Sequence, residues 1–180
     1  GLIPFMVKYA FEFRQKLAGI PTVLTVHNAQ YQGWMGWDKY YMLPAFDSWK
    51  WGMLDWANSI NPLASAVKCA WKVTTVSHSY LGELREEANG LQDLFQYEAG
   101  KSSGILNGID NQVWDPVTDS MIAKNYDKEL VAKGKKKNKK ELAGQFGLDP
   151  DKPLIAFIGR LVGEKAADLL PEAIAQSIYQ

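Results

Sequence analysis

The pattern of apolar and polar positions along the chain predicts alternating strands and helices. Three short apolar runs, at residues 22–26, 72–76 and 153–159, have the composition of buried parallel strands. Apolar positions with helical spacing predict helices over residues 2–17, 48–58, 62–71, 78–87, 91–99, 128–146 and 165–180. Strands separated by helices form βαβ units, in which a parallel sheet has helices on both faces. The sequence therefore predicts an α/β fold.

Local signals mark where some of these elements begin and end. Asn61 places a capping side chain before Pro62, and Ser77 can cap the helix that follows it. Residues 100–104 (GKSSG) predict a flexible stretch, and residues 107–110 (NGID) predict a turn. Composition alone would place a domain boundary near residue 134 or within the loop LDPDKP.

Both ends of the sequence lie inside predicted helices. The helix over residues 2–17 has no capping residue before it, and the helix over residues 165–180 has no stop signal after it. We therefore expect a fragment of a longer protein. The alternative is that frayed terminal helices simply end there.

Composition and charge exclude several classes of protein. The 180 residues include 20 Lys+Arg and 20 Asp+Glu, and a formal net charge of zero gives no overall field that would attract a nucleic acid. The single cysteine, Cys69, excludes an internal disulfide framework and a cysteine-based zinc site. No apolar run approaches the roughly 20 residues that span a bilayer, and the first residues do not resemble a signal peptide. We therefore expect an intracellular protein without a nucleic-acid or membrane partner.

The loop after the third predicted strand is a candidate anion site. It carries Arg160 and Lys165 between glycines and leads toward the last predicted helix. A planar guanidinium, a mobile ammonium and helix-terminal amides together suit a phosphate or diphosphate. The spacing fits neither GxGxxG nor GxxxxGK[ST]. The alternative is an exposed loop whose two cations only solvate the surface.

Two histidines follow predicted strands. His27 ends the first strand, where a neutral imidazole could donate a hydrogen bond to a substrate hydroxyl; it could equally be a structural histidine. His78 lies between Ser77 and Ser79, but sequence adjacency does not provide the geometry of a nucleophile and its base. Hydrolase chemistry at His78 is therefore not expected.

Aromatic residues are concentrated between residues 31 and 56. Aromatic rings can stack on sugar rings, although we expect most of these side chains to pack within their own loop and one or two to contact a glycan. The residues concerned are Tyr31, Trp34, Trp37, Tyr40, Tyr41, Trp49, Trp51 and Trp56. A separate run of lysines between residues 133 and 140 predicts a solvated helical face, with binding of polyanions as the alternative.

Five segments together resemble one family, the bacterial glycogen synthases and plant starch synthases. The segments are TVHNAQYQG (25–33), KVTTVSHSY (72–80), GILNGIDNQVWDP (104–116), NKKELAGQFGL (138–148) and IGRLVGEKAADLL (158–170). They occur in the family's order and extend over most of the chain. As a set they are specific, whereas no one of them would be.

The resemblance implies the GT-B fold, two Rossmann-like lobes of parallel sheet with flanking helices, each lobe only partly present here. It places the domain boundary after residue 103, earlier than composition alone would. Residues 1–103 would then be the C-terminal part of the first, acceptor-side lobe. Residues 104–180 would then be the N-terminal part of the second lobe, which binds the nucleotide sugar. The implied reaction is transfer of glucose from ADP-glucose or UDP-glucose to the non-reducing end of an α-1,4-glucan. Configuration is retained, and neither a metal nor a further cofactor is implied. The implied location is the bacterial cytoplasm, or a plastid for a plant protein.

The resemblance also assigns residues to the site. His27 matches the active-site histidine near the donor glucose, and Arg160 and Lys165 match the pair that binds the donor diphosphate. The same resemblance implies that Asn28, Asn107 and Gly108 bind the substrate. Two cations would stabilise charge as the nucleoside diphosphate departs. We therefore predict Arg160 and Lys165, together with the matched His27, as the catalytic residues.

Three departures from the family pattern matter. The Lys-Thr-Gly-Gly loop of the first lobe is missing, and so are the acidic catalytic residue and the Gly-rich loop of the second. The family commonly has Gly where this chain has Ala166, which matters only if the backbone there needs a positive φ. We therefore expect the isolated chain to be inactive. The alternatives are a non-catalytic module that binds a glucan or a nucleotide, and a relative of phosphorylase or sucrose synthase.

Overall fold

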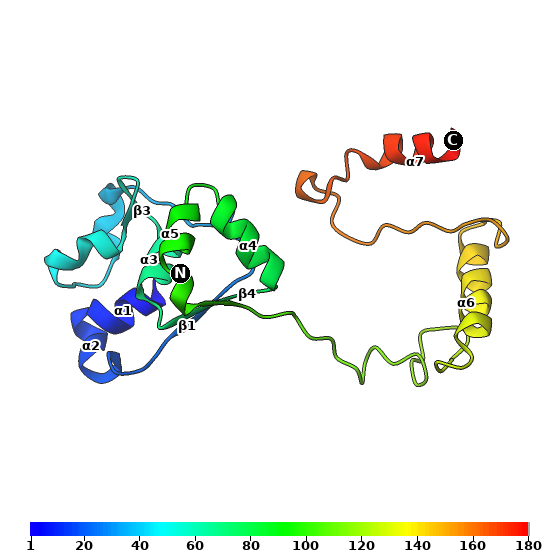
Figure 1. Cartoon of the computed structure of the whole chain (residues 1–180), viewed down its shortest axis with the longest axis horizontal. Helices are drawn as coiled ribbons and strands as arrows, with labels where there is room; N and C mark the ends of the chain where they lie inside the picture. Colours follow the sequence, from blue (N-terminus) through cyan, green and yellow to red (C-terminus); the bar gives the residue numbers. More distant parts are fainter. Residues whose placement is uncertain (180) are drawn as a thin grey trace. The chain divides into compact units, whose positions relative to one another are not determined.

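The computed structural model describes residues 1–179 and divides the chain into two compact units. Unit 1 spans Gly1–Gly108, and unit 2 begins at Ile109. Figure 1 shows the course of the chain, with unit 1 in blue to green and unit 2 in green to red.

A parallel sheet of three strands organises unit 1. The strands are β1 (Val23–Val26), β4 (Lys72–Thr75) and β5 (Ser102–Gly104), in the order β1-β4-β5. In this register Thr75 lies between Val26 and Gly104, so that the three strands end at the same level. The sheet therefore presents all three carboxyl ends along one edge. The strands predicted over residues 22–26 and 72–76 are confirmed.

Three helices lie between the strands of this sheet along the chain: α3 (Pro62–Cys69) precedes β4, and α4 (His78–Glu86) and α5 (Gln92–Tyr97) lie between β4 and β5. Oδ1 of Asn61 accepts a hydrogen bond of 2.9 Å from the amide of Ala64, and Oγ of Ser77 accepts one of 2.9 Å from the amide of Tyr80. These bonds satisfy amides that the first turn of a helix leaves without a partner. Both predicted caps are thereby confirmed.

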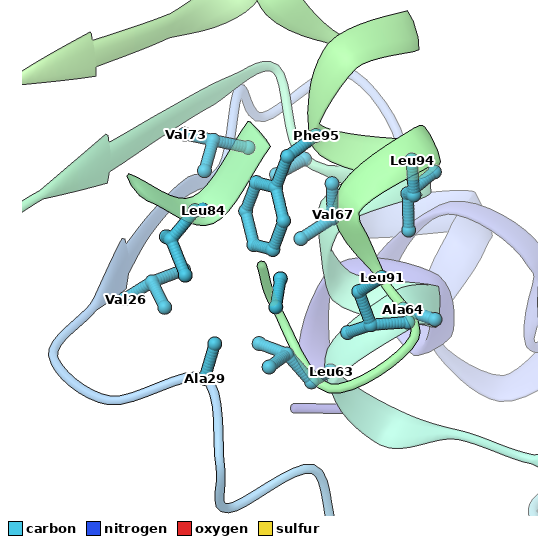
Figure 2. Close-up of a cluster of buried hydrophobic side chains, with 12 residues drawn as sticks. Val26, Ala29, Leu63, Ala64, Val67, Val73, Leu84, Leu91, Leu94 and Phe95 are labelled. Atoms are coloured by element: carbon cyan, nitrogen blue, oxygen red, sulfur yellow. The ribbon is translucent and has the colours of Figure 1, made fainter. Parts of the chain in front are cut away.

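The main hydrophobic core joins the sheet to these helices, as Figure 2 shows. Val26 and Val73 from the sheet meet Val67 of α3, Leu84 of α4 and Phe95 of α5, and all five side chains are buried. Burial of such side chains stabilises each by about 1.5–3 kcal/mol relative to exposure. The core therefore fixes the strands whose ends carry the candidate site.

The first predicted helix is two helices, α1 (Ile3–Tyr9) and α2 (Phe11–Leu17). Ala10 between them is extended, with φ −70° and ψ 132°, and pairs with Phe46 in a β-bridge. The amide of Phe11 donates to the carbonyl of Ala45 at 2.9 Å. A single helix over residues 2–17 is thus wrong, because the amide of Phe11 bonds to Ala45 and not to a carbonyl one helical turn before it.

The aromatic segment forms turns and a hairpin. The 3₁₀ turns η1 (Trp37–Met42) and η2 (Ser48–Met53) precede β2 (Asp55–Trp56) and β3 (Ser59–Ile60). The helix predicted over residues 48–58 is therefore wrong. Ala57 and Asn58 join the two strands with φ of 51° and 61°, values that no α-helix accommodates.

Most aromatic rings of this segment are exposed, contrary to the expectation that they pack within the loop. Trp37 is the best anchored: its Nε1 donates to Oδ1 of Asp55 at 2.8 Å, and its ring meets Trp51 edge to face. The exposed rings are those of Tyr31, Trp34, Tyr40, Tyr41, Trp49 and Trp51. Short 3₁₀ turns offer few interior positions, which accounts for the difference.

Residues 100–104, predicted as a flexible stretch, lie in the turn η3 (Ala99–Lys101) and the strand β5. Oγ of Ser102 donates to the carbonyl of Glu98 at 2.8 Å, and Lys101 forms an ion pair of 3.0 Å with Glu98. Gly104 packs directly on the backbone of Ser77 and His78, where a Cβ would collide. The strand therefore forms through tertiary contacts, although its residues have little intrinsic preference for a sheet.

Unit 2 contains α6 (Val131–Gln145), the turn η4 (Gly163–Lys165) and α7 (Leu170–Tyr179). These confirm the last two predicted helices, although α7 begins later than expected. All strands found in residues 1–179 lie in unit 1, so the strand predicted over residues 153–159 is wrong for this structure. Ile155 and Ile158 are 75% and 97% exposed. A parallel strand needs a neighbour for its backbone groups, and within the described chain this segment has none.

No helix in residues 1–179 combines the length and the apolar character that crossing a membrane requires.

Candidate active site

Polar residues follow each strand at the carboxyl edge of the sheet in unit 1. His27 and Asn28 follow β1, Ser77 precedes α4 just after β4, and Asn107 lies three residues beyond β5. The ladder extends one residue past β5, because the amide of Ile105 donates to the carbonyl of Thr75 at 2.8 Å. In open parallel sheets this edge is where ligands bind.

A groove of about 440 Å³ opens beside the loop after β1. Its lining includes His27, Asn28 and Tyr31 from the loop, and Pro62 and Leu63 from the start of α3. His27 is exposed and Asn28 is half-buried. Oδ1 of Asn28 accepts a hydrogen bond of 2.8 Å from the amide of Gln30, which turns the chain sharply after the strand. His27 thus lines a concave surface at the carboxyl edge of the sheet.

A buried polar network holds this loop in place. Gln32 is 2% exposed, and its Nε2 donates to the carbonyls of Ala88 at 3.3 Å and of Asn89 at 3.0 Å. Nδ2 of Asn61 donates to Oε1 of Gln32 at 2.8 Å. The amide of Ala29 also donates to the hydroxyl of Tyr80, at 3.0 Å. The loop is therefore tied to α3, to α4 and to the connection between α4 and α5.

Sequence reasoning missed Gln32 and assigned Asn61 only a capping role. Asn61 in fact does both, because its Oδ1 caps α3 while its Nδ2 reaches Gln32. A glutamine in a predicted loop carries no signal of burial, since such residues are usually exposed. The burial of Gln32 and Asn61 could have been predicted only for the two together. A buried polar side chain needs a hydrogen-bond partner, and each of these two residues supplies one for the other.

Asn107 and Gly108 close unit 1 and are both exposed. Because β5 is parallel to β1 and β4, the segment that carries them leaves the sheet at the same edge as His27. His78, by contrast, begins α4, and the neighbouring Ser77 hydroxyl caps that helix and lies 3.1 Å from Oγ of Ser79. The structure thus gives Ser77 a structural task and supports the prediction that no hydrolase site lies there.

Arg160 and Lys165 lie in unit 2, on a loop with its own backbone hydrogen bonds. The amide of Val162 donates to the carbonyl of Arg160 at 3.0 Å, and the amide of Lys165 donates to the carbonyl of Val162 at 3.0 Å. Both cationic residues are exposed. The turn η4 ends at Lys165, and α7 begins only at Leu170, so the loop does not lead directly into a helix as we had expected.

Ala166, which follows the lysine, has φ 51° and ψ 32°. This is the left-handed conformation, in which a residue with a Cβ is strained and glycine is favoured. The condition under which Ala166 would matter, a positive φ, is therefore met.

No group of three or more His, Cys, Asp and Glu side chains in the described part of the chain is arranged to hold a metal ion.

Comparison with known proteins defines the class to which this fold and this loop belong. Residues 1–97 match the family model described as the starch synthase catalytic domain. That match covers more than half of the chain, and the chain therefore belongs to the starch synthase catalytic domain family. The resemblance seen in the sequence is confirmed.

Two curated glycogen synthases are similar to this chain over its full length. The chain is 54% identical over 180 residues to the glycogen synthase of Flavobacterium johnsoniae, covering 100% of this chain and 38% of that protein. It is 35% identical over 188 residues to the glycogen synthase of Streptococcus gordonii, covering 100% of this chain and 39% of that protein. The chain thus spans about two fifths of the length of these curated relatives.

A solved structure shows the same fold. The catalytic domain of starch synthase IV from Arabidopsis thaliana, bound to ADP and acarbose, matches with a TM-score of 0.79 and 28% identity. The match covers 98% of this chain and 37% of that one. The expected fold class, α/β of the GT-B type with only part of the two lobes, is confirmed by this likeness.

Proposed function

We propose that the protein containing this chain transfers glucose from ADP-glucose to the non-reducing end of an α-1,4-glucan, with retention of configuration. The observation that carries the proposal is the His27 loop. Its imidazole lies at the carboxyl edge of a parallel sheet, beside a groove, in a chain of the starch synthase family. ADP as the nucleotide is supported by the starch synthase IV structure, which is bound to ADP.

The proposed diphosphate site is the loop of unit 2 that carries Arg160 and Lys165. Arg160 would bind the diphosphate through a planar pair of donors, and Lys165 would add a mobile positive charge. When the bond between the glucosyl C1 and the diphosphate oxygen breaks, its electron pair stays on that oxygen. Two cations then stabilise the developing negative charge more than they stabilise the bound donor, which is the condition for catalysis.

The proposed sugar site lies at the sheet edge of unit 1. His27 would donate a hydrogen bond to a hydroxyl of the donor glucose, and Asn28, Asn107 and Gly108 would line the same site. Amide side chains and backbone amides are suited to this task because each can donate and accept hydrogen bonds with hydroxyl groups. Exposure of His27 and Asn107 is consistent with contact to a ligand.

The lobe assignment is also a proposal. Residues 1–103 would be the end of the acceptor-side lobe and residues 104–180 the beginning of the nucleotide-sugar lobe. The compact unit Gly1–Gly108 supports a division near this point. We also propose a cytoplasmic location, by analogy with the bacterial glycogen synthases to which the chain is similar.

A transfer assay on the full-length protein tests the proposal. With maltooligosaccharide as acceptor, ADP-glucose should give longer α-1,4-glucan products, and UDP-glucose should give them more slowly. Failure to elongate the acceptor with either donor contradicts the proposed function. Preference for inorganic phosphate or fructose as co-substrate would favour the phosphorylase-like or sucrose-synthase-like alternative instead.

The isolated chain should be inactive in the same assay, because it spans only about two fifths of its curated relatives. Titration of this chain with ADP and with maltooligosaccharides examines the second candidate, a binding module. Tight binding by the isolated chain together with no transfer by the full-length protein would favour that candidate.

A further inference from the structure

The hydroxyl group of Tyr80 holds the loop that carries His27. It accepts a hydrogen bond of 3.0 Å from the amide of Ala29, two residues after the histidine. The two bonded residues are 51 positions apart along the chain, so this bond joins the loop after β1 to the helix after β4. The loop is thereby attached to a different element at the carboxyl edge of the sheet.

Hydrogen bonds of two kinds shape residues 27–31. The amide of Gln30 donates to Oδ1 of Asn28 within the loop, which sharpens the turn without attaching it to another element. The bond from the amide of Ala29 to Tyr80 makes such an attachment. The direction in which the chain leaves β1 therefore depends on the hydroxyl of Tyr80.

The position of Tyr80 is itself fixed. Its amide donates to Oγ of Ser77 at 2.9 Å, which caps α4, and its ring packs against the main core. Oγ1 of the buried Thr75 donates to the carbonyl of Ser77 at 2.9 Å, which anchors the start of α4 to the end of β4. A side chain whose backbone and ring are held in this way can place another group precisely.

The ring and the hydroxyl of Tyr80 have different tasks. The ring adds apolar area to the core cluster that contains Val26 and Ala29, both labelled in Figure 2. The hydroxyl binds an amide of the loop, and Ala29 is only 2% exposed. Loss of the hydroxyl would leave this amide without its partner, which favours a shift of the loop toward a new one. Phenylalanine at this position would keep the ring and remove the bond.

We propose that Tyr80 is a positioning residue for glucose transfer, which acts by holding His27 at the angle that meets the donor sugar. This inference rests on the proposed function, in which the imidazole donates a hydrogen bond to a hydroxyl of that sugar. Such a contact needs correct placement, because a displacement of about 1 Å can lower a rate about 100-fold. Arg160 and Lys165 would still bind the diphosphate, so the loss should appear in turnover and not in donor binding.

Kinetics of Tyr80→Phe in the full-length protein test the inference. The substitution should lower kcat for glucose transfer about ten-fold and change KM for ADP-glucose by less than about two-fold. Tyr9→Phe is the matched control, because it removes a hydroxyl from another half-buried ring of unit 1, which packs against Phe5. This control should leave kcat unchanged. Assays well below the melting temperature of each variant exclude partial unfolding as the cause.

A double-mutant cycle with His27→Ala separates positioning from a general effect on the fold. If Tyr80 acts through His27, Tyr80→Phe should lower kcat less than about two-fold once the imidazole is absent. Hydrogen exchange of the full-length protein supplies a readout that needs no catalysis. Residues 27–31 should exchange faster in Tyr80→Phe, whereas α3 should exchange at the wild-type rate.

Three results would overturn the inference: normal kcat in Tyr80→Phe, the same ten-fold loss with and without His27, or unchanged exchange over residues 27–31. The inference and the proposed function fail separately. If the wild-type protein transfers no glucose, the proposed function fails, while faster exchange over residues 27–31 still supports the hold of Tyr80 on the loop. Transfer by the wild-type protein together with normal kcat in Tyr80→Phe overturns only the role of Tyr80.

Discussion

Asn61 and Gln32 are joined by a hydrogen bond of 2.8 Å from Nδ2 of the asparagine to Oε1 of the glutamine, and both side chains are buried. Asn61 also caps α3 with its other polar atom, and Gln32 donates to two backbone carbonyls. The pair therefore connects the start of a core helix to the loop that carries His27. Buried polar groups of this kind are costly to leave without partners.

Removal of Gln32 should destabilise unit 1. Gln32→Ala leaves Nδ2 of Asn61 and the carbonyls of Ala88 and Asn89 without this partner, and each such loss costs about 1–3 kcal/mol unless water replaces it. We expect a loss of about 2–4 kcal/mol in the free energy of unfolding, measured by urea denaturation. The control is Gln30→Ala, at an exposed position in the same loop, which should change it by less than about 0.5 kcal/mol. Equal effects of the two substitutions would contradict the role given to Gln32.

Alkaline pH should destabilise the fold through Cys69. Burial raises the pKa of the Cys69 thiol from 9.0 to about 11, because a thiolate would form among the apolar side chains around it. The folded chain thus holds this proton more tightly than the unfolded chain. The resulting stability, about 2–3 kcal/mol, is fully present below pH 9 and is lost as the pH rises through 11.

Thermal unfolding between pH 7 and pH 11 measures this effect. Cys69→Ala removes the thiol but keeps Lys68 and Tyr9, so the difference between the two chains isolates the contribution of Cys69. The wild-type chain should lose more stability than the variant between pH 9 and pH 11. Parallel pH profiles would show that the thiol is not the group responsible.

Ala166 should weaken the proposed diphosphate loop through its strained backbone. The left-handed conformation costs a residue with a Cβ about 1–2 kcal/mol, and glycine avoids that cost. In the full-length protein Ala166→Gly should therefore raise the free energy of unfolding by about 1 kcal/mol, as measured by urea denaturation. Ala167→Gly is the adjacent control and should give no such gain. A loss of stability in the Ala166 variant would contradict this interpretation.

Substitutions in the turn between β2 and β3 should change the stability of unit 1, because two residues of this turn have positive φ. Ala57 and Asn58 both have positive φ, as in the type I′ turns that favour asparagine and glycine. Ala57→Asn should stabilise unit 1 by about 0.5–1 kcal/mol, and Ala57→Val should destabilise it by more than about 1 kcal/mol. Urea denaturation of the two variants gives both values. A stabilising valine would contradict the assigned backbone conformation.

The sequence predicted the elements whose signals are local. Asn61 and Ser77 cap helices through contacts three residues away. The strand before His27 shows its extended conformation in its β-branched composition, although Val26 is the one buried residue of its four. The position of His27 at the sheet edge followed from that strand. These features depend on nearest neighbours along the chain, which a sequence displays directly.

Features that depend on distant parts of the chain were missed. The strand β5 consists of two serines and a glycine, and it forms because it pairs with β4 and packs on Ser77 and His78. Ala10 interrupts a helix because Phe46 pairs with it. Conversely, residues 153–159 have the composition of a strand but find no neighbour within residues 1–179.

Turnover of Arg160→Ala and Lys165→Ala in the full-length protein tests the central claim most directly. If the two cations stabilise the departing diphosphate, each substitution should lower kcat for glucose transfer by about 10²–10³-fold. The melting temperature should stay within about 2 °C of the wild-type value, because both residues are exposed. Lys136→Ala, at an exposed lysine of α6, controls for the loss of a charge. Near-normal turnover of both variants would contradict the assignment of Arg160 and Lys165 to the donor diphosphate.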